Sequence, residues 1–212
     1  LSSLWRPHFR LPAEELPGLE ETVYFIDYQG ARIVSLNSNE GIEVQVEWLE
    51  RVLSSNPHPC TIVTFHHPVF SAAEGSDNAD LRELWKPILV RHRVELFLTG
   101  HDHSYGRGRN LAVGANRVER VAGTVYVVSV SGPKMYSLGE QPWRDRAAEN
   151  SLLYQVVSID GDRLHYEART AVGDLYDAFE LVKDEGGPNR LIDKVPADVP
   201  ERRHANTLGG GR

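Results

Sequence analysis

Residues 94–103 read Val-Glu-Leu-Phe-Leu-Thr-Gly-His-Asp-His, an apolar run that ends in two histidines one residue apart. The apolar part, residues 94–98, predicts a buried β-strand. Two imidazoles that follow one strand can converge on a single point, and neutral imidazole is the commonest metal ligand in proteins. This stretch therefore predicts an α/β sheet that carries a metal site at the end of a strand.

A second strand-like run leads to histidines in the same way. Residues 61–65 are Thr-Ile-Val-Thr-Phe, and His66-His67-Pro68 follow directly. Open α/β sheets bind ligands outside the carboxyl ends of their strands, so two neighbouring strand ends predict one shared site. A polar loop that merely contains His101 and His103 is the alternative, and the second pair of histidines argues against it.

The surrounding pattern favours an α/β fold. Two β-rich runs separated by Gln29-Gly30 predict a hairpin over residues 22–36. Residues 43–53 have the periodicity of an amphipathic helix, and a second helix is predicted from Asp77 or Asn78 to residue 89, with a break at Pro87. After residue 103, four further strand-like runs predict a mostly antiparallel half, at residues 124–131, 152–159, 163–170 and 175–181.

Composition narrows the classes of function. The formal net charge of -7 argues against a nucleic-acid-binding surface, and the sequence has no run that is apolar for long enough to cross a membrane. Cys60 is the one cysteine, and a single thiolate is too few for a zinc–thiolate site. We expect Cys60 to be a small buried side chain. We expect one domain over residues 1–182 and an extended or disordered tail over residues 183–212, where Gly, Pro and charge dominate.

The two histidine motifs resemble a known family. Val63-Thr64-Phe65-His66-His67-Pro68 and Gly100-His101-Asp102-His103 resemble the last two motifs of the calcineurin-like metallophosphoesterases. The purple acid phosphatase branch fits further, at residues 19–24, 45–49, 103–105 and 128–133. The resemblance implies a mixed α/β (α+β) fold, of which this chain would be the C-terminal half of a four-layer α/β/β/α sandwich.

The resemblance also implies a ligand set. The family holds two metal ions side by side, so His66 and His101 would bind one ion and His103 the other. Zinc, iron and manganese all accept histidine, and the implied reaction is metal-assisted hydrolysis of a phosphate ester. An extracellular or periplasmic location is implied by the family alone.

The sequence departs from the family in what it lacks. The family's ligand-bearing Gly-Asp and Gly-Asn-His motifs, its bridging aspartate and its catalytic histidine would all lie upstream of residue 1. Gly161-Asp162 and Gly173-Asp174 fall in predicted turns and do not replace them. We therefore expect a chain that is inactive or weak alone, and that forms a homodimer or associates with the missing half. The alternative is a non-catalytic binding module with a degenerate single-metal or metal-free site.

Residues beside the motifs are expected to have other roles. His67 is the one candidate left for a catalytic role; in an extended backbone it would point away from the metal, toward substrate or into packing. Asp102 is expected to be a solvated loop acid or a partner of the ligands. Arg107 and Arg109 are expected either to meet phosphate or to be surface charges, and Tyr105 to pack. Five histidines lack a partner at ligand spacing and are expected to be structural or solvent-facing: His8, His58, His92, His165 and His204.

Overall fold

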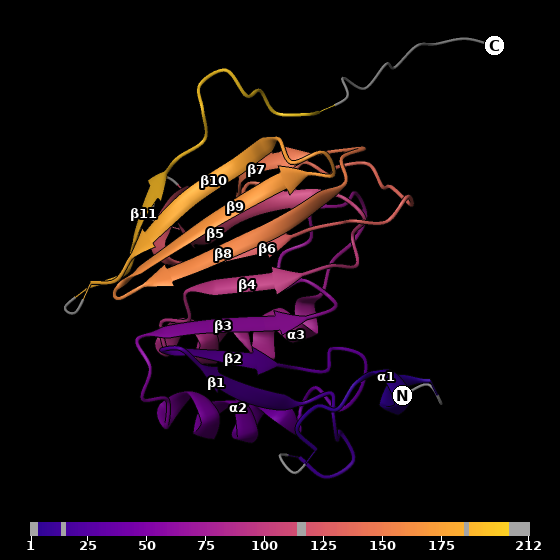
Figure 1. Cartoon of the computed structure of the whole chain (residues 1–212), viewed down its shortest axis with the longest axis vertical. Helices are drawn as coiled ribbons and strands as arrows, with labels where there is room; N and C mark the ends of the chain where they lie inside the picture. The colour runs from indigo at the N-terminus through magenta and orange to yellow at the C-terminus, as the bar shows by residue number, and fades with distance from the viewer. Residues whose placement is uncertain (1–3, 14–15, 114–117, 185–186, 204–212) are drawn as a thin grey trace.

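The computed structural model describes residues 4–13, 16–113, 118–184 and 187–203, which form two β-sheets with helices beside the larger one (Figure 1). The larger sheet has seven strands in the order β1-β2-β3-β4-β6-β5-β7. Its strands are β1 (Tyr24–Tyr28), β2 (Ala31–Ser35), β3 (Cys60–Phe65), β4 (Leu96–Thr99), β5 (Tyr105–Val113), β6 (Val118–Val128) and β7 (Arg144–Ala148).

The centre of this sheet is parallel. β2 pairs with β3, β3 with β4, and β4 with β6, all in the parallel sense, whereas β1, β5 and β7 are antiparallel to their neighbours. The predicted hairpin is confirmed as β1 and β2, which turn at Gln29 and Gly30, both with positive φ. The carboxyl ends of β3 and β4 therefore lie at one edge, on the right in Figure 1.

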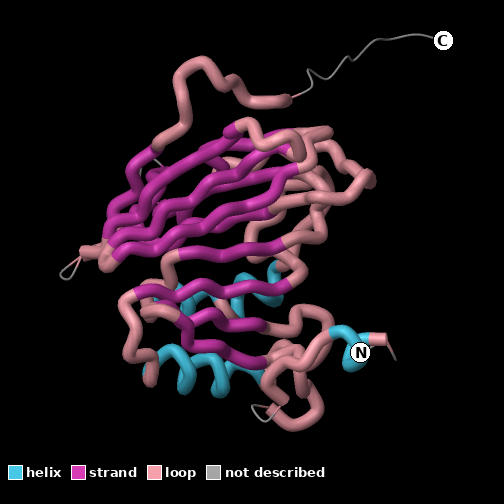
Figure 2. Tube along the Cα trace, in the orientation of Figure 1, coloured by secondary structure: helices cyan, strands magenta, loops and turns pink. Residues whose placement is uncertain are grey.

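The helices pack on one face of the seven-stranded sheet (Figure 2). α2 (Gln45–Ser54) places Trp48, Leu49 and Val52 in this core, as its periodicity predicts. The second predicted helix is split into α3 (Ala79–Leu84) and α4 (Lys86–Arg91). Pro87 lies in the first turn of α4, where a missing N–H costs nothing, so the predicted break falls just before it. One further helical turn, α1 (Trp5–His8), lies near the amino terminus.

The opposite face of the seven-stranded sheet packs on the second sheet. That sheet is antiparallel, with the order β11-β10-β9-β8, and its strands are β8 (Leu153–Asp160), β9 (Arg163–Thr170), β10 (Leu175–Val182) and β11 (Arg190–Asp193). β9 alternates buried and less buried residues, so Leu164, Tyr166 and Ala168 face the first sheet. A second apolar core thus lies between the sheets.

The mixed α/β prediction holds in outline. The described residues form three layers, namely helices, a seven-stranded mixed sheet and a four-stranded antiparallel sheet. Three strands were not predicted, namely β5, β7 and β11. The longest described helix, α2, has 10 residues, so none of the helices in this part of the chain could span a lipid bilayer.

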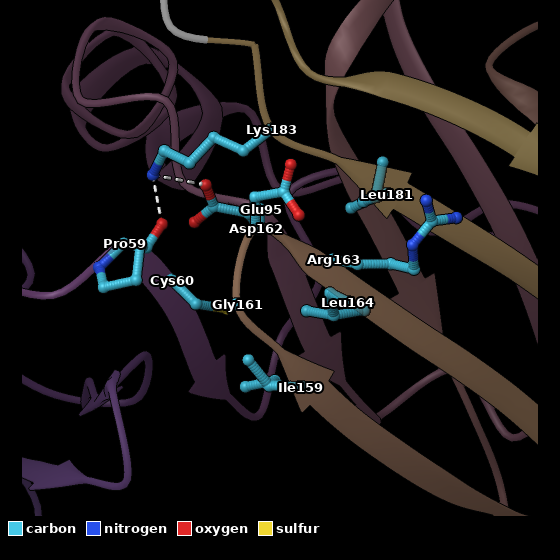
Figure 3. Close-up of a pocket in the computed structure, with 10 residues that line it drawn as sticks. All are labelled: Pro59, Cys60, Glu95, Ile159, Gly161, Asp162, Arg163, Leu164, Leu181 and Lys183. Carbon is cyan, nitrogen blue, oxygen red and sulfur yellow. Dashed lines mark hydrogen bonds and ion pairs between the residues drawn. The ribbon is translucent and has the colours of Figure 1, made fainter.

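The chain after Val182 is anchored to the first sheet near the amino-terminal ends of β3 and β4 (Figure 3). The ammonium of Lys183 lies 3.0 Å from the carboxylate of Glu95 and also donates to the carbonyl of Pro59. Asn189, which is buried, donates to the same carboxylate at 3.2 Å. The expected boundary at residue 182 stays a prediction, but the described part of the expected tail contributes β11 and this anchor; residues 185–186 and 204–212 lie outside the described residues.

Candidate metal centre

The histidines gather where two adjacent parallel strands end. Phe65 of β3 is in register with Thr99 of β4, so the residues that follow these strands emerge side by side. The N–H of Gly100 donates to the carbonyl of His66 at 3.1 Å, which joins the two loops directly. Strand pairing thus brings together side chains that are far apart in the sequence.

His66, His67 and His101 form one cluster. Each offers a ring nitrogen, and the three nitrogens lie within 4.8 Å of one another. Nδ1 of His101 is 3.1 Å from Nε2 of His66. This separation allows an N–H of one ring to donate to the other, and it equally suits two lone pairs directed at one cation. Two nitrogens bound tetrahedrally to one zinc ion would lie about 3.4 Å apart, so this pair fits a metal ion with little movement.

The cluster favours neutral rings. Burial lowers the pKa of His66, His67 and His101 below the ordinary value for histidine. Repulsion between the rings lowers these pKa values further, because a protonated ring would lie beside another ring that can also be positively charged. Neutral imidazole is the form that binds metals, so the environment prepares these side chains for that role.

His67 lies inside the cluster and does not point away from it. Its ring is 4.2 Å from the ring of His101, centroid to centroid. The hydroxyl of Ser38 lies 3.1 Å from Nδ1 of His67 and accepts a hydrogen bond from its backbone N–H at 2.9 Å. Ser38 follows β2, the next parallel strand, and that position was the one sequence signal that could have identified it.

His103 is held apart from the other three rings. Its Nδ1 lies 2.9 Å from the backbone carbonyl of Lys134, so Nδ1 carries the proton and donates. Nε2 is then the nitrogen with a free lone pair. Tyr136 stacks near the same ring at 4.8 Å. This separation is compatible with His103 serving a different ion from His66 and His101, and that assignment stays a prediction.

Asp102 anchors the loop from inside. Its carboxylate is fully buried, not solvated, and accepts hydrogen bonds from the hydroxyl of Ser71, the backbone N–H groups of Ala72 and Ala73, and the hydroxyl of Ser76. The histidines on either side, His101 and His103, have φ of 70 and 50. Left-handed conformations are uncommon for residues other than glycine, so the buried anchor holds both in place.

The two arginines past the motif do not reach the cluster as free charges. Arg107 is fully buried between the sheets, where it pairs with Asp177 at 2.8 Å; both expected roles for it, phosphate contact and surface charge, are wrong. Arg109 is partly buried and pairs with Asp145 at 2.7 Å. Tyr105 packs as expected and donates to Asp177. These residues make such contacts because the side of strand β5 that carries them faces the second sheet.

The other described histidines stand away from the cluster and have partners of their own. His58, His92 and His165 each lie within 3.4 Å of a carboxylate, on Asp27, Glu50 and Glu167 respectively. A ring nitrogen of His8 lies 2.7 Å from the carbonyl of Leu4. His204 lies outside the described residues. These contacts agree with structural or solvent-facing roles.

Comparison with known proteins supports the motif assignment. Residues 6–105 match the family model described as Calcineurin-like phosphoesterase. Tartrate-resistant acid phosphatase type 5 from rabbit (Oryctolagus cuniculus) is 30% identical over 118 residues, which cover 49% of this chain and 34% of that protein. The chain thus spans about a third of the length of this relative.

Solved structures share the fold. A purple acid phosphatase from yellow lupin (Lupinus luteus) seeds matches with a TM-score of 0.65 and 23% identity, over 84% of this chain and 35% of that one. PhoD matches with a TM-score of 0.62 and 14% identity, over 93% of this chain and 49% of that one. Residues 6–105, just under half of this chain, thus match the calcineurin-like phosphoesterase family, and the relatives of the chain include acid phosphatases of the tartrate-resistant and purple types.

Proposed function

We propose that this chain provides the histidine side of a metal-dependent phosphoester hydrolase of the acid phosphatase or phosphodiesterase type. The observation that carries the proposal is the 3.1 Å approach of His66 Nε2 and His101 Nδ1 at the ends of adjacent parallel strands. The family match and the acid phosphatase relatives support the choice of phosphate esters as substrates.

The roles of the side chains follow from their placement. His66 and His101 would hold one zinc, iron or manganese ion, and His103 would hold a second. When bound, such ions lower the pKa of a water molecule and stabilise the charge of the phosphoryl oxygens. His67, oriented by Ser38, is the imidazole left to face substrate. The chain's own residues thus position the ions and one face of the substrate.

We further propose that this half-site needs carboxylates from elsewhere. Among the described residues, the group able to hold a metal contains histidines alone, and the nearest acid in sequence, Asp102, is turned into the protein. The chain would then supply the C-terminal part of the four-layer fold, with low turnover by itself. A fragment that carries the missing motifs would complete it.

Metal content and turnover test these proposals together. The purified chain is loaded with zinc, manganese or iron, dialysed, and assayed for bound metal and for p-nitrophenyl phosphate hydrolysis. We expect metal to be retained, and lost in His66→Ala and His101→Ala, with turnover near background. His165→Ala, on the outer sheet, is the matched control and should retain metal. Equal metal content in all variants would refute the centre, and robust turnover by the isolated chain would refute its incompleteness.

A non-catalytic binding module is the second candidate, and the lack of a carboxylate in the described histidine cluster favours it. Such a module would bind one ion or none and would stay inactive in any assembly. Assay of the metal-loaded chain with and without a fragment that carries the missing motifs separates the candidates. Turnover that appears only with that fragment supports the hydrolase, whereas an assembly of the two without turnover supports the module.

A further inference from the structure

A fourth parallel strand, after β2, β3 and β4, delivers a loop to the same edge of the sheet. β6 lies next to β4 and runs parallel to it, and the N–H of Ser129, just after β6, donates to the carbonyl of Thr99. The loop that continues from Ser129 reaches His103 and makes two hydrogen bonds with it. The carbonyl of Lys134 accepts from the His103 ring, and the N–H of Tyr136 donates to the His103 carbonyl.

The side chain of Lys134 is exposed beside these two hydrogen bonds. Its ammonium lies over the ring of Tyr136, 4.9 Å from the centroid, and that ring is in turn 4.8 Å from the ring of His103. Within the described part of the chain, no carboxylate oxygen lies within ion-pair distance of this ammonium, in contrast to Lys183 and Lys194. Lys134 thus presents an ammonium that no carboxylate of the described residues pairs with.

The ammonium of Lys134 lies on the loop that is bonded to His103, beside the histidine cluster. A lysine ammonium is a compact cation with three donors, and it binds phosphate oxygens as a point charge. Since neutral histidines hold no charge of their own, Lys134 is the group of this cluster suited to attract an anion.

We propose that Lys134 forms a phosphate subsite beside the histidines, with Tyr136 as the positioning residue that holds its ammonium there. This inference rests on the proposed function and extends it. Because attraction grows with the charge of the partner, the subsite should favour the dianionic phosphoryl group of a monoester over the monoanion of a diester. Lys134 would thus be a residue by which this site distinguishes a dianionic phosphoryl group from a monoanionic one.

Binding of inorganic phosphate tests the subsite without requiring turnover. Calorimetry of the metal-loaded chain with inorganic phosphate should give a saturable signal, weakened about tenfold or more in Lys134→Met, as for loss of a charged hydrogen bond. Lys134→Arg and Tyr136→Phe keep the charge and the ring and should stay within about threefold of wild type. Dimethyl phosphate, a monoanion, should bind more weakly and lose less in Lys134→Met.

A matched control comes from α4. The ammonium of Lys86 also lies over an aromatic ring, 5.2 Å from the centroid of Phe70, and Lys86→Met should leave phosphate binding unchanged. Metal content is measured in every sample. Normal metal content with equal phosphate binding in wild type and Lys134→Met, or with none in wild type, would overturn the subsite alone. Loss of metal from the wild type itself would overturn the proposed function and the subsite with it.

Discussion

Replacement of Asp102 by alanine gives the sharpest test of how the histidine loop is built. The carboxylate lies between His101 and His103 in sequence, yet it is fully buried and has no contact with solvent. It accepts from the Ser71 hydroxyl at 2.7 Å, from the N–H of Ala73 at 3.2 Å, and from the N–H of Ala72. The change to alanine removes the acceptor for all of these donors at once.

The expected loss follows from what each donor can do afterwards. The hydroxyl of Ser71 can rotate toward another acceptor, whereas the backbone N–H groups of Ala72 and Ala73 are fixed in buried positions. An unsatisfied buried donor costs about 1–3 kcal/mol, so two of them should lower the free energy of unfolding by about 4 kcal/mol. Asp102→Asn keeps one acceptor oxygen and loses the charge, so about 2 kcal/mol is expected.

Urea unfolding followed by tryptophan fluorescence measures the loss. Trp143 donates its indole N–H to the carbonyl of Ser71, so it reports on the same loop. The measurement needs metal-free buffer, because metal binding would add its own stabilisation. Asp160→Ala, at an exposed strand end, is the control and should stay within about 0.5 kcal/mol of wild type.

The metal affinity of the Asp102 variants is the second readout. Both neighbouring histidines are held in left-handed conformations, so a released loop should bind metal about 10–100-fold more weakly. A loss of stability below about 1 kcal/mol in Asp102→Ala would show that the loop is held by other contacts. Unchanged metal affinity despite a large loss of stability would show that the anchor does not orient the ligands.

Three further perturbations probe the fold. Asp177→Ala removes the fully buried carboxylate that pairs with Arg107, leaves the guanidinium with Asp193 at 3.1 Å and Asp145 at 3.9 Å, and should cost about 3 kcal/mol in urea unfolding; a cost below about 1 kcal/mol would contradict the ion pair. Gly108→Ala would drive a Cβ into the backbone just before β7 and should cost about 3 kcal/mol, whereas Gly132→Ala meets open space and should be near neutral; equal effects would contradict the close approach. Burial raises the pKa of Glu95 above 4.5, so the folded chain keeps this proton to higher pH than the unfolded chain. Its contribution to stability is therefore full below the pKa of the unfolded side chain and falls as pH rises through the folded pKa. Glu95→Gln should then flatten the dependence of the urea midpoint on pH above 4.5; an unchanged slope would contradict this.

The parts of the fold that the sequence predicts are those with strong local patterns. The apolar run before His101 and the run before His66 form strands that are covered on both faces of the sheet. Each run is followed by a pair of histidines, so the strand and the site could be predicted together. The face of α2 and the break before Pro87 follow from periodicity and from the missing N–H of proline. These signals are all contained within a few residues of chain.

Strand β5 shows why the rest could not be predicted. Its sequence contains Gly106, Gly108 and Arg107, none of which favours a strand. The glycines are needed because distant segments pass directly over them, Ala72 over Gly106 and Trp143 over Gly108. Arg107 is buried because Asp177, on the other sheet, neutralises it. Tertiary contacts between distant segments thus decide this element, and they leave no local trace in the sequence.

The candidate site also combines residues that local patterns predict with residues that only the fold brings together. Its chemistry depends on the second group. The histidines could be predicted from strand ends, but Ser38 and Lys134 come from the loops after β2 and β6, which only the strand order brings alongside. Neutral imidazoles leave the charge of a bound ion undiminished, and the ammonium adds to it. The described residues thus favour an anion at this edge, and carboxylates from elsewhere would be needed to balance two metal ions. Because positive charge is in excess at this edge, we expect this chain to bind phosphate even where it does not turn a substrate over efficiently.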